Sequence, residues 1–322
     1  MSLPALADRR LSLDAGCALC VAGWSDRSTG GNFGRCGVAL IGVPESLCGV
    51  SKNVAVPHLQ KTFACDHPVA LVTGSGAPRV GRVIAEHLAS LGCRIVLHAN
   101  SSTAEAQQIA ARLRERYQEA LVVSGDVQES EAVDAMVKQA TDTFGRIDIL
   151  VNSAAIWSPL PLEQVTAEEL RRYFDVNAVG SFLMAKAVGL VMVRQSSGGA
   201  IVNISDWATT RPYLDHAAYF PSKGAVEAMT RSLAVELGRR NHRVRVNCIQ
   251  PGPVLLGADV EDDKRERITS SMLVGRIGTP EQVAHAAQFL CENEFVTGVV
   301  LPVDGGRSIY ADDGLQDGLN TG

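Results

Sequence analysis

From residue 67 onward, short apolar segments alternate with longer segments that have the period of an amphipathic helix. The first such pair is the apolar run 68–73 and the helical run 80–91. Strands that alternate with long helices form a parallel sheet covered on both faces, because each crossover helix packs across the sheet. Right-handed crossovers make this a doubly wound α/β sheet of the Rossmann type. The other expected strands are 93–98, 120–124, 147–152, 199–204, 244–249 and 298–303, and the other expected helices are 103–117, 131–144, 167–195, 217–239 and one that begins at 280.

Residues 1–66 differ from the rest, since they are rich in glycine, serine and cysteine and show no sustained period. We expect an irregular, loosely ordered N-terminal extension there, a single Rossmann-type domain over 67–310 and an acidic, glycine-rich tail over 311–322. Two alternatives for the extension are a metal site that begins at Cys17 and Cys20 and an export signal. No histidine completes a usual zinc pattern, and Asp14 interrupts the short apolar run, so we favour neither.

The composition excludes several classes of function. A net charge of -5 and a sequence pI of about 5.8 argue against a nucleic-acid binder. No uninterrupted apolar run approaches the ~20 residues that span a bilayer, so we expect no membrane partner. The cysteines beyond residue 66 lie in apolar or strand-like contexts, which is typical of small core residues in a reducing compartment, and we expect a cytoplasmic protein. These cysteines are Cys93, Cys248 and Cys291.

Tyr219 and Lys223 form the strongest candidate for catalysis. Residues four apart on a helix share a face, so the lysine ammonium can lie beside the phenol. A nearby cation favours the phenolate and lowers the pKa of a tyrosine from its usual value near ~10. The pair is therefore a candidate general acid/base, and the strand that ends in Ser205 and Asp206 precedes it.

A glycine-rich turn joins the first strand to the first helix, from Thr73 to Gly81. Glycines there let the backbone approach a phosphate, and the free amides of a helix N-terminus attract the anion. Gly74, Arg79 and Val80 are the expected phosphate contacts, whereas the simpler alternative is a plain turn between strand and helix.

The end of the second strand bears on cofactor choice. NAD-preferring sheets usually place an acid there for the ribose hydroxyls, but this chain has Asn100 and Ser101. The absence of an acid removes a repulsion against a 2′-phosphate, and Arg79 or Arg82 can supply positive charge, so NADP(H) is favoured over NAD(H). After the third strand, Asp126 and Val127 are expected to hold the adenine; an ordinary polar strand end is the alternative.

Several motifs occur in one order along the chain. They are the Thr-Gly turn, Asp126, Asn152-Ser-Ala-Ala155, Asn177, the strand 200–206, Tyr219 with Lys223, Pro251-Gly252-Pro253-Val254, and Val303-Asp-Gly-Gly306. Over residues 67–310 this pattern resembles the short-chain dehydrogenase/reductase family. The resemblance implies one Rossmann-type domain, a nicotinamide cofactor, a small-molecule substrate, and a homotetramer or homodimer built on the two long helices.

The resemblance also implies a role for each matching residue. Tyr219 becomes the proton donor to the substrate, and Lys223 lowers the pKa of Tyr219 and binds the nicotinamide ribose. Asn177 becomes the holder of a water that links Lys223 to solvent. The remaining cofactor contacts are Asn152 and Ala154 near the nicotinamide ribose, and the turn Pro251, Gly252 and Val254, with Val254 at the carboxamide.

Three positions depart from the common family pattern: Asp206 replaces the usual serine, Arg79 replaces a turn glycine, and Ser153 follows Asn152. The first two resemble the pteridine reductase branch, which also stacks its ligand on an aromatic residue at the place of Trp157. Three features differ from that branch. Ala155 stands where the branch has a pterin-contacting serine, and the phosphate loop is one residue longer than in the branch. The histidine and arginine that the branch has after the second strand are matched only in part, by His98 and Asn100.

An aspartate at position 206 changes the expected chemistry. An ionised carboxylate cannot donate a hydrogen bond to a carbonyl oxygen, but a carboxyl whose pKa is raised by burial can hold or pass a proton. Asp206 would then serve reduction of a C=N bond; the alternative is that it only caps the end of the strand. The segment 255–275 is expected to cover the substrate. Further apolar substrate contacts are expected from Trp207, Tyr213 and Met272.

The leading hypothesis is an NADP(H)-dependent reductase of a C=N or C=O group, with a pteridine as the first candidate substrate and no metal. A ketone or 3-oxoacyl carbonyl reductase is the alternative within the enzyme class. A regulatory protein that binds NADP without turnover is the alternative outside it, and the retained Asn177, Tyr219 and Lys223 argue against it.

Overall fold

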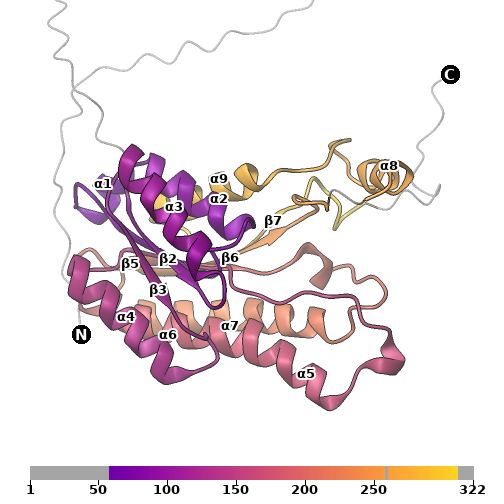
Figure 1. Ribbon diagram of the computed structural model, residues 1–322, viewed down its shortest axis with the longest axis horizontal. Coiled ribbons are helices and arrows are strands. Elements are labelled where there is room, and N and C mark those ends of the chain that lie inside the picture. The colour runs from indigo at the N-terminus through magenta and orange to yellow at the C-terminus, as the bar shows by residue number, and fades with distance from the viewer. Residues whose placement is uncertain (1–57, 258–259, 311–322) are drawn as a thin grey trace, which may run out of the picture. The chain divides into compact units, whose positions relative to one another are not determined.

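The computed structural model describes residues 58–257 and 260–310. Parallel strands form one sheet in the order β3-β2-β1-β4-β5-β6-β7 (Figure 1). The chain runs outward from β1 to β3 and then returns to the other side of β1 with β4, so the strand order reverses between β1 and β4. In doubly wound sheets a ligand binds at the carboxyl ends beside this reversal. The strands are β1 Val69–Val72, β2 Arg94–Ala99, β3 Ala120–Ser124, β4 Ile149–Asn152, β5 Gly199–Ile204, β6 Val244–Pro251 and β7 Val300–Val303.

Helices cover both faces of the sheet, which confirms the doubly wound fold (Figure 1). Alternate residues of β1 serve the two layers: Ala70 and Val72 pack with one group of helices, and Val69 and Leu71 with the other. Burial on both faces explains why the central strands are continuous apolar runs. One layer contains α2 Val80–Ser90, α3 Thr103–Arg116 and α9 Pro280–Glu292, and the other contains α4 Ser130–Phe144, α6 Gly180–Arg194 and α7 Tyr219–Gly238.

The long helix expected over 167–195 is helical throughout but not uniform. It begins as α5 Ala167–Tyr173, widens into the π-helical segment η3 Phe174–Val179, and continues as α6. Segments of π-helix occur frequently at functional sites, and this one carries Asn177. By length and composition the helical span 167–194 could cross a membrane, since an 18-residue window within it has a mean hydropathy of 1.8, but half of that window is buried inside this fold.

The N-terminal boundary differs from the expectation. Residues 58–63 form helix α1 (His58–Phe63), whose Leu59 and Phe63 are each 1% exposed in the core beside α9. The folded part therefore begins before residue 67, because these two apolar side chains complete one layer. Six residues are too few to reveal a helical period in the sequence. The predictions made for residues 1–57, including Cys17 and Cys20, and for the tail 311–322 lie outside the described residues.

Short helices that the sequence did not predict follow β4, β5 and β6. They are η2 Leu162–Gln164 after β4, η4 Trp207–Thr209 after β5, and α8 Asp262–Ser270. The helix α8 lies within the segment that was expected to cover the substrate. No residue of α8 is buried, so its own apolar content gave no periodic signal.

Candidate active site

Tyr219 and Lys223 lie on the buried face of α7, beside the end of β5. Tyr219 is the first residue of the helix, and the spacing of four places Lys223 one turn further on the same face. The exposed fractions are only 5% for Tyr219 and 4% for Lys223. The Lys223 Nζ donates to the carbonyl oxygen of Ile204 over 2.9 Å and lies 5.9 Å from the centroid of the Tyr219 ring.

Asp206 joins this pair from the end of β5. The Tyr219 hydroxyl donates to Asp206 Oδ2 over 3.1 Å. The other carboxylate oxygen, Oδ1, accepts the Ala208 amide over 2.9 Å at the start of η4. Asp206 thus caps a turn and also holds the phenol, so the alternative in which it only caps the strand end does not describe this geometry.

The neighbouring serine faces away from the phenol, as the alternation of side chains along a strand predicts. The Ser205 hydroxyl is bonded to the carbonyl of Lys223 at 3.2 Å and to Glu227 Oε1 at 2.6 Å. The Glu227 oxygen also accepts from Thr209 at 2.6 Å and from Gln250 at 2.9 Å. This network fixes the backbone on both sides of Asp206 without adding a group to the reacting site.

Asn177 is fully buried in the π-helical segment and clamps the loop after β4 against α7. Its amide donates to the Ile156 carbonyl at 3.2 Å and to Ser222 Oγ at 3.0 Å, and its oxygen accepts the Ile156 amide at 2.9 Å. Both donor positions are therefore used within the protein. The water-holding role expected of Asn177 stays a prediction.

A groove of about 430 Å³ runs along the carboxyl ends of β1, β2, β3 and β4. It follows the reversal of strand order, where a doubly wound sheet binds its ligand. The expected cofactor residues that line it are Gly74, Arg79, Asn100, Ser101, Asp126, Val127 and Ala154.

The glycine turn passes close to the loop after β4. Gly74 has φ +65°, and a Cβ there would lie 2.8 Å from the Cα of Ala154. Helix α2 begins at Val80, and its N-cap residue Arg79 gives it no side-chain cap. The first amides of α2 are thus left for an anion, and this cradle fits the pyrophosphate of a dinucleotide.

His98 and Arg82 have partners within the protein instead of facing a phosphate. His98 is 1% exposed, and its ring bonds to the Gly74 amide at 3.1 Å and to the Gly125 carbonyl at 2.9 Å, so it cannot reach a 2′-phosphate. Burial lowers the pKa of His98, which keeps the ring neutral in this position. Arg82 pairs with Glu86 at 3.1 Å and does not line the groove, which leaves Arg79 as the cation there.

Two further cofactor candidates are already hydrogen-bonded to other groups of the protein. Asn152 is 2% exposed, and its amide donates to the Ser181 carbonyl and to Asn203 Oδ1, each at 3.0 Å. Asp126 accepts from the Gln128 amide at 3.0 Å and from Asn100 at 3.3 Å, so its carboxylate is fixed before any ligand arrives.

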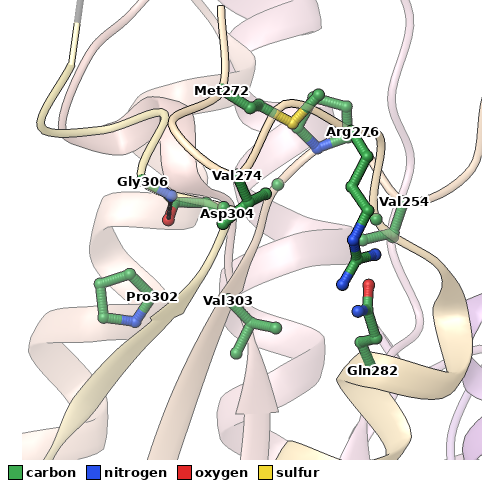
Figure 2. A pocket seen from close by; sticks show the side chains of 13 residues that line it. Val254, Met272, Val274, Arg276, Gln282, Pro302, Val303, Asp304 and Gly306 are labelled. Atoms are coloured by element: carbon green, nitrogen blue, oxygen red, sulfur yellow. Dashed lines mark hydrogen bonds between the residues drawn. The ribbon is translucent and has the colours of Figure 1, made fainter. Parts of the chain in front are cut away.

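A second cavity, of about 300 Å³, lies beside the turn after β6 (Figure 2). Gly252 and Val254 line it, and Pro251 is the last residue of β6. Figure 2 shows the Arg276 side chain extended towards Gln282 at one rim. Met272, expected at the substrate, is 3% exposed and forms a wall of this cavity rather than of the aromatic cluster described next.

An aromatic cluster adjoins Tyr219. Trp157 is 54% exposed and stacks on His216 with ring centroids 5.1 Å apart, and Tyr213 meets the same ring edge-on at 4.8 Å. Trp207 is 7% exposed beneath Arg307, whose guanidinium lies 4.6 Å above the indole. The structure thus brings Trp157 and Tyr213 near the site, and places Trp207 mainly in packing.

The comparisons with known proteins agree with this geometry. The family model described as enoyl-(acyl carrier protein) reductase matches residues 77–308. D-threitol dehydrogenase of Mycolicibacterium smegmatis is 37% identical over 253 residues, which cover 77% of this chain and 95% of the relative. The chain belongs to the short-chain dehydrogenase/reductase family. L-rhamnose 1-dehydrogenase (NAD(P)(+)) of a Sphingomonas species is 32% identical over 245 residues, covering 74% of this chain and 95% of the relative.

A solved structure agrees as well. The chain superposes with a TM-score of 0.69 and 28% identity on a protein described as a short-chain alcohol dehydrogenase from Sinorhizobium meliloti 1021, over 74% of this chain and 96% of that one. This short-chain dehydrogenase/reductase is therefore an NAD(P)-dependent oxidoreductase of the type that acts on carbonyl or alcohol groups of small molecules.

In this short-chain dehydrogenase/reductase the pKa of the Tyr219 phenol is shifted in the direction opposite to the expected one. Burial and the neighbouring Asp206 raise the pKa of Tyr219 well above its usual value, so the phenolate is disfavoured here. Burial also lowers the pKa of Lys223, while Asp206 opposes that shift. The net pKa shift of Tyr219 is thus opposite to the one expected from Lys223 alone, because the carboxylate is the phenol's direct partner. The lowering contribution of Lys223 stays a prediction.

The same burial raises the pKa of Asp206, against the Ala208 hydrogen bond, the Lys223 charge and the Tyr219 hydroxyl. Two adjacent acids, each disfavoured as an anion, titrate as a pair. The sequence analysis did not identify His216, Phe220 and Arg307 as neighbours of the candidate site. Only the position of His216, three residues before Tyr219, could have pointed to it.

Proposed function

We propose that the protein is an NADP(H)-dependent reductase that delivers hydride to a C=O or C=N carbon, with Tyr219 as the proton donor. The hydrogen bond between Tyr219 and Asp206, beside buried Lys223, carries this proposal. A bound nicotinamide dinucleotide supplies the hydride. The protein supplies an acid within reach of the substrate heteroatom and a fixed ammonium group close by.

Asp206 gives the proton transfer its second acid. When Tyr219 releases its proton to the substrate, a phenolate forms next to the Asp206 carboxyl. Two neighbouring anions in a buried site are costly, so this step favours the form in which Asp206 is protonated and can return the proton to Tyr219. The raised pKa of Asp206 supports this assignment. The balance over one cycle is one proton taken from solvent and one given to the substrate.

The groove favours NADP(H) over NAD(H). Arg79 lines it without an ion-pair partner among the described residues, whereas the end of β2 has no acid that would repel a 2′-phosphate. Asn100 and Ser101 offer hydrogen bonds there instead. We assign the 2′-phosphate to Arg79, and the adenine to the side of the groove that holds Asp126 and Val127.

The substrate is a small molecule that enters beside Trp157. A pteridine is the first candidate, because the outer face of Trp157 is half exposed next to the groove and the Asp206–Tyr219 pair suits protonation at nitrogen. A hydroxylated ketone or its alcohol is the second candidate. The relatives named for threitol and rhamnose support this candidate.

The decisive experiment is NADPH oxidation with dihydrobiopterin and, separately, with a panel of ketones, using Tyr219→Phe as the control. If the wild type turns over one of the two substrate classes and Tyr219→Phe does not, the proposal is supported. The class that is turned over then identifies the substrate. A protein that binds NADPH tightly and reduces neither class would instead be a cofactor-binding regulator.

We further propose a homotetramer or homodimer in the cytoplasm. Apolar side chains of α6 and of the preceding π-helical segment η3 are exposed to solvent in the single chain. Helix α7 contributes one more exposed apolar side chain. Large exposed apolar patches mark association surfaces. The described cysteines are all free, as a reducing compartment predicts. The open apolar side chains are Val179, Phe182, Leu190 and Val235. Sedimentation of the purified protein tests the assembly.

A further inference from the structure

One buried polar atom beside the proposed catalytic residues has no partner. The His216 side chain lies in the loop before α7 and is only 6% exposed. Its Nε2 is shielded from solvent and makes no hydrogen bond with the protein. Buried side-chain nitrogens nearly always have a partner, so an orphaned one calls for an explanation.

The other ring nitrogen fixes what Nε2 can do. Nδ1 lies 2.8 Å from the Leu214 carbonyl oxygen, which can only accept, so Nδ1 carries the hydrogen. In the neutral imidazole, Nε2 is then a bare lone pair. It can accept a hydrogen bond but cannot give one.

Aromatic rings enclose this imidazole, and none of their polar atoms makes a hydrogen bond to Nε2. Trp157 stacks on it at 5.1 Å, Phe220 lies at 5.6 Å, and Tyr213 and Tyr219 meet it edge-on at 4.8 and 6.2 Å. The ring of Tyr219 belongs to the proposed proton donor. A donor that reaches Nε2 would therefore belong to a molecule bound at the reacting site, next to Trp157.

We propose that His216 is a specificity-determining residue, whose Nε2 accepts a hydrogen bond from a donor that the substrate carries beside its reacting carbon. The donor is a hydroxyl group or a ring N–H. This inference rests on the proposed function, since it places the substrate against Tyr219. A simple ketone leaves Nε2 unpaired, and a site with an unpaired polar atom discriminates against it.

The test compares two ketones that differ in one hydroxyl, acetoin and 2-butanone, with NADPH as the reductant. The wild type should prefer acetoin in kcat/KM by about tenfold to a hundredfold, the range expected for one buried hydrogen bond. His216→Phe keeps an aromatic ring but removes the acceptor, so its preference should fall to near one while turnover of 2-butanone persists. His87→Phe, a histidine outside the site that pairs with Gln288, should keep the wild-type preference.

A second measurement separates this inference from the proposed function. The binding of 2,3-butanediol and of 2-butanol to the NADP complex can be followed by tryptophan fluorescence, because Trp157 stacks on His216. Tighter binding of the diol that His216→Phe abolishes supports the inference, even if no ketone is turned over. An unchanged preference for the hydroxylated compound in His216→Phe, in turnover or in binding, overturns it. Equal losses on both members of a pair overturn it too, since they indicate a structural role.

Discussion

Asp206 accepts the phenolic hydrogen of Tyr219 over 3.1 Å, so the carboxyl and the phenol act as one titrating unit rather than as a separate base and acid. Tyr219→Phe removes the only hydroxyl of that unit. We expect turnover to fall by about 10²- to 10⁴-fold, the usual contribution of a positioned general acid. NADPH affinity should stay within a few-fold, because the groove residues are untouched. A stopped-flow assay of hydride transfer with a fluorescence titration of NADPH measures both.

The raised pKa of Asp206 predicts a pH dependence with a definite sign. The folded protein holds this proton more tightly than the unfolded chain does, whose carboxyl titrates near 3.8. Between 3.8 and the raised value, the contribution of Asp206 to the free energy of unfolding therefore falls as pH rises. Asp206→Asn cannot titrate and should lose this slope. Urea unfolding of both proteins from pH 4 to pH 7 measures it. Parallel curves would show that the carboxyl is not perturbed.

Arg79 is predicted to set the preference for NADPH. Arg79→Ala should raise the KM for NADPH by about tenfold to a hundredfold, since a charged hydrogen-bond partner of the 2′-phosphate is lost. The KM for NADH should change little. Arg82→Ala is the matched control, because Arg82 is one helical turn away and pairs with Glu86 outside the groove. An equal rise of the KM for NADPH and for NADH in Arg79→Ala would contradict the assignment of the 2′-phosphate to Arg79.

The sheet was predictable because each strand and crossover helix has its own periodic signal. Tyr219 and Lys223 were predictable for a similar reason, since a spacing of four on a helix fixes a shared face. The side to which Asp206 points follows from strand alternation, and Ser205 occupies the opposite side as expected.

What escaped prediction depends on contacts between distant segments. The pKa of Tyr219 is set by its depth and by Asp206, neither of which its own neighbours in the sequence reveal. His98 matched the pteridine reductase pattern only in part, and its two ring nitrogens bond to Gly74 and Gly125, contacts that the sequence does not reveal. For His216 the sequence offered only its position three residues before Tyr219, and the stacking of the distant Trp157 on its ring could not be read from that.

Helix α1 is predicted to be an integral part of the domain. Phe63 is 1% exposed in the core, so Phe63→Ala should lower the free energy of unfolding by about 3–5 kcal/mol. Lys61→Ala, on the exposed side of the same helix, should change it by less than about 0.5 kcal/mol. Thermal and urea unfolding of the two variants make the comparison. A small loss for Phe63→Ala would mean that the domain does not need residues 58–63.

A comparison of Gly74 with Gly145 separates the effect of backbone strain on stability from the effect of the glycine turn on cofactor binding. Gly145 has φ +75° with open space around a Cβ, so Gly145→Ala should cost about 1–2 kcal/mol of stability through strain alone. Gly74 has φ +65°, but a Cβ there would meet the Ala154 backbone at 2.8 Å. Gly74→Ala should therefore be the more destabilising of the two. It should also weaken NADPH binding, because the displaced backbone lines the groove. Isothermal titration at a temperature where both variants are folded isolates the second effect. Equal NADPH affinities would place the pyrophosphate away from this turn.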